Sequence, residues 1–181
     1  MIRIISGTHK SRRLQAPKNL PVRPTTDRAK EALFNILGGG LHWTEASVLD
    51  LYAGTGNISY ECASRGCTSV TAVDAHPGCV KFIEKTASQL GMQISVVRRD
   101  VMKFLEQCGQ SFDLIFADPP YEITPEELGK LVSTCLERGL LKPGGVLVLE
   151  HASSRDLGNL MGFQEVRRYG RTHFSFFTQD K

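Results

Sequence analysis

The segment Asp118-Pro-Pro-Tyr121 is the part of the sequence best suited to chemistry. Two consecutive prolines cannot donate to a sheet ladder, so a strand must end there and the loop that follows is rigid. Such a loop can hold a carboxylate, free carbonyl oxygens and an aromatic ring in a fixed arrangement. The oxygens would accept the N–H protons of a planar group bearing an amine, and Tyr121 would stack on its ring. The alternative is a rigid turn in which Asp118 caps a helix.

A glycine-rich loop, Asp50-Leu-Tyr-Ala-Gly54-Thr-Gly56, comes earlier in the chain, between a predicted strand and a predicted helix. In α/β sheets the ligand lies outside the carboxyl ends of the strands, and glycines there let the backbone come close to it. The dinucleotide fingerprint has a third glycine where this chain has Ser59, and the Gly-Lys-Ser/Thr of a phosphate loop is missing. A ligand poor in phosphate therefore fits better than a nucleotide with a phosphate chain.

Two further acidic residues stand at the ends of predicted strands. Asp74 ends the second strand, and a carboxylate there can accept both ribose hydroxyls of a nucleoside. Asp100 ends the third strand, where it could meet the adenine edge. Each acid alone could equally be a helix cap, and for Asp100 that alternative stays open. Together with Asp118 and the glycine loop, however, these acids would line one crevice.

The elements that must position these residues follow an alternating pattern from residue 46 onward. Short β-rich runs at 46–53, 70–74, 94–97, 112–117 and 146–149 alternate with helical patterns, which indicates a parallel sheet covered on both faces. Residues 77–90 form one predicted helix, closed by Gly91. Thr124 and Glu127 have the spacing of a capping box at the start of another. Residues 142–145 are predicted to turn the chain.

The two ends of the chain carry different patterns. Residues 163–169 and 172–178, joined through Gly170, predict a terminal antiparallel hairpin with alternating apolar residues. Near the N-terminus, residues 2–6 and 12–16 flank Gly7 and predict a small basic hairpin. Residues 27–37 have one apolar stripe at helical spacing.

Charge is distributed unevenly along the chain, although the net charge is only +3. Residues 1–40 hold eight basic and two acidic side chains, a balance of +6, and the remaining 141 residues carry −3. This asymmetry indicates a basic arm on a near-neutral body and suggests a polyanionic partner. The alternative is a soluble, flexible tail.

Composition excludes several other classes. A chain of 181 residues, 41% apolar, suits one globular domain with an appendage. No run approaches the roughly 18–20 apolar residues of a membrane span, and the N-terminus lacks the architecture of a signal peptide, so we expect a cytoplasmic protein. The five cysteines and five histidines are scattered, so we expect no metal site, and most of the cysteines should be small buried apolar groups.

The order of the glycine loop, Asp74, Asp100 and Asp118-Pro-Pro-Tyr121 resembles class I S-adenosylmethionine-dependent methyltransferases that modify exocyclic amines. Four N-terminal segments narrow the resemblance to the bacterial 16S ribosomal RNA guanine-N2 methyltransferase family called RsmD: Arg3–Gly7, Arg12–Leu14, Arg23–Thr25 and Asp27–Leu37. The resemblance covers about residues 2–178. Two departures are mild: Tyr52 stands where Phe is common, and Thr55 where Ser is common.

This resemblance implies a fold and a division of the chain. The fold is a Rossmann-like α/β fold with a mostly parallel seven-stranded sheet, helices on both faces and an antiparallel C-terminal hairpin. Residues 1–22 would form a basic extension that binds RNA, and residues 23–181 the methyltransferase domain, in which 23–40 cover the cofactor. We expect a monomer whose partner is 16S rRNA or the assembling small ribosomal subunit.

The resemblance also assigns roles to residues. Asp118, Pro119, Pro120 and Tyr121 would be catalytic, with no covalent enzyme intermediate. S-adenosylmethionine would be bound by Arg23, Thr25, Asp50, Tyr52, Ala53, Gly54, Thr55, Gly56, Asp74, Ala75, Asp100, Val101 and Asp118. The arm residues that contact RNA phosphates would be Arg3, His9, Lys10, Arg12, Arg13 and Lys18.

Other functions remain open at this point. An adenine-N6 or cytosine-N4 DNA methyltransferase also uses Asp-Pro-Pro-Tyr, but no segment is long enough for a separate DNA-recognition domain. Methylation of a protein glutamine usually goes with Asn at position 118. A non-catalytic nucleic-acid-binding module would not need the intact Asp118 loop, and a nicotinamide oxidoreductase is disfavoured by Ser59.

Overall fold

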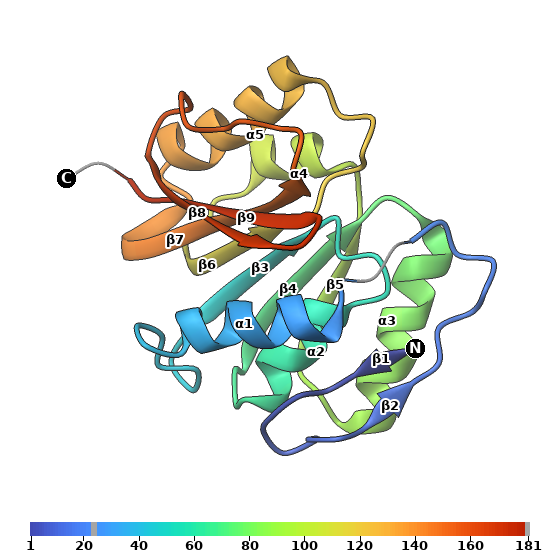
Figure 1. Ribbon diagram of the computed structural model, residues 1–181. Coiled ribbons are helices and arrows are strands. Elements are labelled where there is room, and N and C mark those ends of the chain that lie inside the picture. The colour runs from blue at the N-terminus through green and yellow to red at the C-terminus, as the bar shows by residue number, and fades with distance from the viewer. Residues whose placement is uncertain (23–24, 180–181) are drawn as a thin grey trace.

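A seven-stranded sheet forms the centre of the computed structural model, which describes residues 1–22 and 25–179 (Figure 1). The strand order is β5-β4-β3-β6-β7-β9-β8. Strands β3 to β7 are parallel, and β9 runs antiparallel to both β7 and β8. The strands are β3 (Ser47–Leu51), β4 (Ser69–Asp74), β5 (Ile94–Arg98), β6 (Phe112–Ala117), β7 (Leu141–Ala152), β8 (Phe163–Tyr169) and β9 (Thr172–Phe177). The predicted Rossmann-like fold with a C-terminal antiparallel hairpin is therefore confirmed.

Helices cover both faces of the sheet (Figure 1). One face carries α1 (Asp27–Leu37), α2 (Asn57–Ser64) and α3 (Pro77–Leu90), and the other carries α4 (Val101–Gln107) and α5 (Pro125–Glu137). Side chains alternate along β3 accordingly: Leu49 and Leu51 pack with α4 and α5, whereas Val48 packs with α1 and α2. All five cysteines are buried and free, as expected.

Several local signals in the sequence are confirmed. Helix α1 has the predicted bounds. The side chain of Thr124 accepts from Glu127 N, and the side chain of Glu127 accepts from Thr124 N, which completes the predicted capping box of α5. Gly91 ends α3 in the left-handed conformation, and Gly170 lies in the turn between β8 and β9.

Two expectations about strands were wrong. Residues 142–145 do not form the predicted turn before a strand. They lie inside β7 as an irregularity, since Leu141 pairs with Phe112 and Val146 pairs with Leu114. Strand β3 is shorter than the predicted 46–53, because Tyr52 has a positive φ of 54° and cannot continue it. Helix α4 was not predicted.

The N-terminal arm, residues 1–22, contains the predicted hairpin in a shorter form. Strands β1 (Ile2–Arg3) and β2 (Arg13–Leu14) pair antiparallel. The arm is docked onto α2 and α3, since Ile2 and Ile4 are buried in a cluster with Tyr60 and Ile83. Gly7 approaches so closely that a Cβ there would lie 1.7 Å from Ser64 O. The alternative of a flexible tail is thus wrong for this hairpin.

Candidate active site

Acidic residues gather at the carboxyl ends of the parallel strands, which meet at one edge of the sheet. Leu51, Ala117 and Leu149 are register partners in β3, β6 and β7. Asp118 and Glu150 directly follow two of these partners, so they are neighbours at that edge. Glu150 was not singled out from the sequence, although it follows an apolar strand just as Asp118 does.

The glycine loop is held to the end of β4 by Asp74. One carboxylate oxygen of Asp74 accepts from Gly54 N at 2.8 Å, and the other accepts from His76 N at 2.8 Å. Gly54 and Gly56 have positive φ values of 57° and 85°, which favour glycine. A Cβ at Gly56 would lie 2.7 Å from the ring of Tyr60, so this position has no room for a side chain. The loop and Asp74 therefore form one unit.

Asp50, in β3, binds the helix that follows the glycine loop. Its side chain is buried and accepts from Ser59 N at 3.1 Å and from Ser59 Oγ at 2.6 Å. Burial raises the pKa of Asp50 to about 7, with a further upward contribution from Asp74, while the hydrogen bonds from Ser59 oppose this. Ser59, where a dinucleotide-binding loop has glycine, thus ties the start of α2 to β3.

Asp118 stands at the centre of the acidic edge. It is half-buried, and burial, followed by the nearby carboxylates of Glu150 and Asp50, raises its pKa well above the ordinary range. Asp118 N donates to Leu51 O at 3.4 Å, which ties β6 to the start of the glycine loop. Partly buried carboxylates that repel one another favour a positively charged ligand.

The Pro-Pro-Tyr segment projects from this edge toward solvent. Pro119 is half-buried, Pro120 is exposed, and Tyr121 is 73% exposed, so its ring is free to contact a flat ligand. Arg155 donates to the carbonyl oxygens of Tyr121 and Ile123 and thereby fixes the loop backbone. No pattern in the sequence had pointed to Arg155.

The start of α1 is fastened to the same edge by Thr25. Its hydroxyl donates to Glu150 Oε2 at 2.6 Å, and its carbonyl oxygen accepts from Asn57 Nδ2 at 3.3 Å. Thr25 itself is buried. Its predicted neighbour in the cofactor site, Arg23, lies outside the described residues.

The other residues predicted to bind the cofactor lie along the same edge, with different exposures. Asp100 is exposed and caps α4 by accepting from Lys103 N at 3.0 Å, so the helix-cap alternative is confirmed for it. The remaining positions divide into the buried Ala53, Thr55 and Val101, the half-buried Tyr52 and the exposed Ala75.

The arm residues predicted to contact RNA fall into two groups. Arg3 pairs with Asp27 at 2.9 Å, and a ring nitrogen of His9 lies 3.0 Å from Leu90 O, so both help to hold the arm in place. The other four cationic side chains are exposed and form no ion pair with any described carboxylate: Lys10, Arg12, Arg13 and Lys18.

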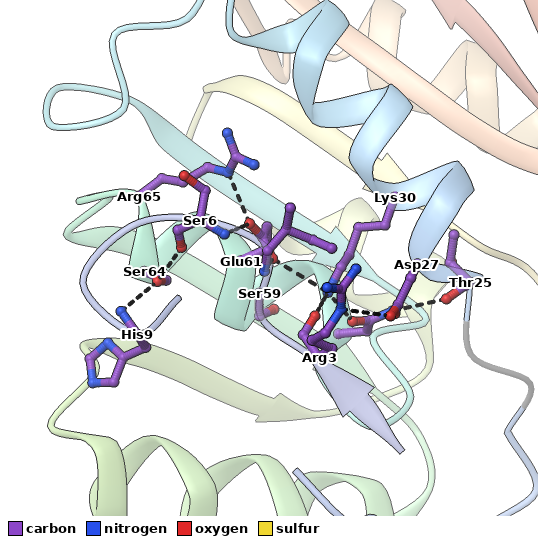
Figure 2. A network of polar contacts seen from close by, with 12 residues as sticks. Arg3, Ser6, His9, Thr25, Asp27, Lys30, Ser59, Glu61, Ser64 and Arg65 are labelled. Carbon is purple, nitrogen blue, oxygen red and sulfur yellow. Dashed lines mark hydrogen bonds and ion pairs between the residues drawn. The ribbon is translucent and has the colours of Figure 1, made fainter. Parts of the chain in front are cut away.

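A buried polar network joins the arm to α1 and α2 (Figure 2). Glu61 accepts from Ile5 N at 2.8 Å and from Ser6 N at 3.0 Å, and it forms an ion pair with Arg65 at 3.0 Å. Lys30 lies 3.3 Å from Glu61 and donates to Arg3 O and to Asn57 Oδ1. Because Asn57 also binds Thr25, the network extends from the arm to the acidic edge.

Metal-binding clusters and membrane-spanning helices are both absent from the described part of the chain. Across residues 1–22 and 25–179, no three His, Cys, Asp or Glu side chains are grouped so that they could hold a metal ion. Among the helices of these residues, none combines the length and apolar character needed to cross a membrane.

Comparison with known proteins gives concordant matches. The family model described as Conserved hypothetical protein 95 matches residues 2–178. YlbH of Bacillus subtilis is 30% identical over 184 residues, covering 97% of this chain and 98% of that protein. Ribosomal RNA small subunit methyltransferase D of Haemophilus influenzae is 31% identical over 161 residues, covering 86% of this chain and 81% of that protein. The solved structure of yhhF from Escherichia coli has a TM-score of 0.86 at 27% identity and covers 99% of this chain and 98% of that one.

Proposed function

The chain belongs to the family described as Conserved hypothetical protein 95, and we propose that it transfers the methyl group of S-adenosylmethionine to the exocyclic N2 amine of a guanine in 16S rRNA. The name of the H. influenzae relative, ribosomal RNA small subunit methyltransferase D, supports the coarser assignment of an rRNA methyltransferase. The observation that carries the proposal is the position of Asp118, on a rigid Pro-Pro loop and beside the glycine loop that Asp74 holds.

The acidic edge fits the proposed cofactor chemically. S-adenosylmethionine, when bound, supplies a methyl group activated by a positively charged sulfur, and it carries no phosphate. Burial, with the nearby carboxylates of Glu150 and Asp50 adding to it, raises the pKa of Asp118, and a cationic ligand would relieve the repulsion among these carboxylates. Asp74 would accept from the ribose hydroxyls, and the backbone of Gly54 and Gly56 would approach the methionine part. Thr25 would close this end of the site together with α1.

The Asp118 loop would act on the amine of the substrate. A guanine N2 amine is a poor nucleophile because its lone pair is delocalised into the ring. The carboxylate of Asp118 and the carbonyl oxygen of Pro119 would accept its N–H protons and favour a pyramidal nitrogen. Tyr121 would hold the base by stacking. Most of the rate enhancement then comes from positioning and electrostatics, and the departing proton goes to Asp118 or to water.

The exposed cations of the arm would supply RNA contacts. Lys10, Arg12, Arg13 and Lys18 are exposed on the arm, whose hairpin is docked on the same domain as Asp118. Contacts to phosphates position the nucleic acid without reading its sequence. The target guanine must leave its stack to reach Asp118, so a loop nucleotide or an extruded base is the expected substrate.

Labelled methyl transfer to small ribosomal subunits, naked 16S rRNA and DNA tests the proposal. We expect label in one of the two RNA substrates, and digestion to nucleosides should yield N2-methylguanosine. Label on adenine N6 or cytosine N4 of DNA would instead support the DNA methyltransferase. Incorporation into neither nucleic acid would contradict both functions.

A further inference from the structure

A surface cavity of about 230 Å³ lies between the start of α1 and the tip of the β8–β9 hairpin. We call it the basic pocket, and the residues that line it are Thr26, Arg28, Ala29, Arg168, Tyr169 and Gly170. In Figure 1 the hairpin is drawn in red and α1 in blue. The pocket therefore brings together two arginines that are far apart in the sequence.

The charge of this pocket is not neutralised by the protein. Arg28 and Arg168 are exposed, and neither forms an ion pair with a carboxylate of the described residues. Arg171, in the two-residue turn between β8 and β9, adds a third exposed cation next to the pocket. By contrast, Arg167 is paired with Glu165 at 2.8 Å.

The pocket flanks the candidate active site. His151, which directly follows Glu150, is the register partner of His173, and His173 is in turn the partner of Arg168. On the other side of the pocket, Thr26 follows Thr25, whose hydroxyl binds Glu150. The pocket thus lies on the β7 and β9 side of the acidic edge, whereas the arm lies over α2 and α3.

We propose that the basic pocket binds a backbone phosphate of the RNA substrate, as a second contact independent of the arm; this rests on the proposed function. Guanidinium groups offer several donors in a planar fork that matches phosphate oxygens. Two arginines lining one small cavity suit a phosphodiester better than a neutral ligand. Together with the arm, the pocket would hold RNA on both sides of Asp118.

The double variant Arg28→Ala/Arg168→Ala tests this inference by RNA binding over a range of KCl concentrations. We expect weaker binding of a 16S rRNA fragment, and a slope of log Kd against log salt that is shallower by about 0.7–0.9 for each phosphate that the variant no longer neutralises. Arg167→Ala is the matched control, because it removes an adjacent arginine that is paired on the surface.

Two further measurements separate the outcomes. Arg28→Lys/Arg168→Lys keeps the charge and should retain most of the salt dependence, while thermal unfolding shows whether the double alanine variant is folded. An unchanged salt slope in a folded variant, with a wild type that methylates RNA, would overturn the basic pocket and leave the proposed function standing. A wild type that neither binds nor methylates RNA would overturn both.

Discussion

Lys30 Nζ and Glu61 Oε2 lie 3.3 Å apart, and neither side chain has any exposed surface. Burial lowers the pKa of Lys30, and the charge of Glu61 opposes this. The pair is sustained by further hydrogen bonds, since Glu61 also accepts from two backbone N–H groups of the arm. The docking of the arm thus depends on a buried ionic network.

Replacing Glu61 by Gln should therefore destabilise the protein and loosen the arm. The variant leaves the ammonium of Lys30 buried without its counter-charge, which costs about 3–5 kcal/mol of unfolding free energy. Trypsin should cut more rapidly at Arg12 and Arg13. Denaturant unfolding and limited proteolysis measure the two effects. The control is Glu165→Gln, which breaks an exposed pair and should cost at most about 1 kcal/mol; equal effects of the two variants would contradict the role of the network.

Removing the carboxylate of Asp118 should stop methyl transfer without preventing cofactor binding. For Asp118→Ala we expect kcat to fall by about a hundredfold or more, which is typical when one oriented group that stabilises the transition state is removed. Asp118→Asn should be similarly impaired, because the amide has one acceptor atom in place of two. Single-turnover kinetics and calorimetric titration with S-adenosylmethionine separate rate from affinity. Retention of the wild-type rate in either variant would refute the assigned role.

Asp74→Ala should weaken binding of S-adenosylmethionine by about tenfold or more, because it removes one or two hydrogen bonds of roughly 1–1.5 kcal/mol each at the ribose and releases the loop. Titration calorimetry measures the affinity. Asp113→Ala is the matched control: Asp113 also accepts from a backbone N–H, of Ser47 at 2.8 Å, but near the amino-terminal edge of the sheet. Equal affinities of the two variants would rule out the ribose contact.

The arm should contribute to RNA binding through charge. Replacing Arg12 and Arg13 together by Ala should weaken RNA binding and make its salt slope shallower by about 1.4–1.8, if each residue neutralises one phosphate. Fluorescence anisotropy of a labelled 16S rRNA fragment at several KCl concentrations gives the slope. The control variant Lys103→Ala/Lys130→Ala removes two exposed charges from α4 and α5, on the opposite face of the sheet. It should leave the salt slope nearly unchanged. A wild-type slope in the arm variant would refute this prediction.

Asp50 should make the stability of the ligand-free protein depend on pH. Its pKa rises from 3.8 to about 7 on folding, so the folded state binds more protons than the unfolded state between these values. The stabilisation that Asp50 gives to the folded state is fully present below about pH 4. It falls by about 1.4 kcal/mol per pH unit as the pH rises to about 7, which amounts to a loss of up to about 4 kcal/mol. The variant Asp50→Asn lacks this pH-dependent stabilisation. Between about pH 4 and pH 7, the wild type should therefore lose stability relative to the variant. A difference that is constant with pH would contradict the assignment.

Much of the fold could be predicted because its signals are local. A glycine in the left-handed conformation ends α3, a capping box starts α5, and a proline pair ends β6. Periodicity located α1 and most of the strands for the same reason. Residues 142–145 misled the prediction, because a Pro-Gly-Gly run can also form an irregularity within a long strand.

Within the candidate site, the chemistry of the strand ends could be predicted from the sequence: the glycine loop, Asp74, Asp118 and the rigid loop to Tyr121. The fold was needed to show which groups lie together: Glu150 beside Asp118, Thr25 on Glu150, and Lys30 buried against Glu61. Residue type and spacing fix what a short segment can do. The partner of a buried charge depends instead on contacts between segments that are distant in the chain.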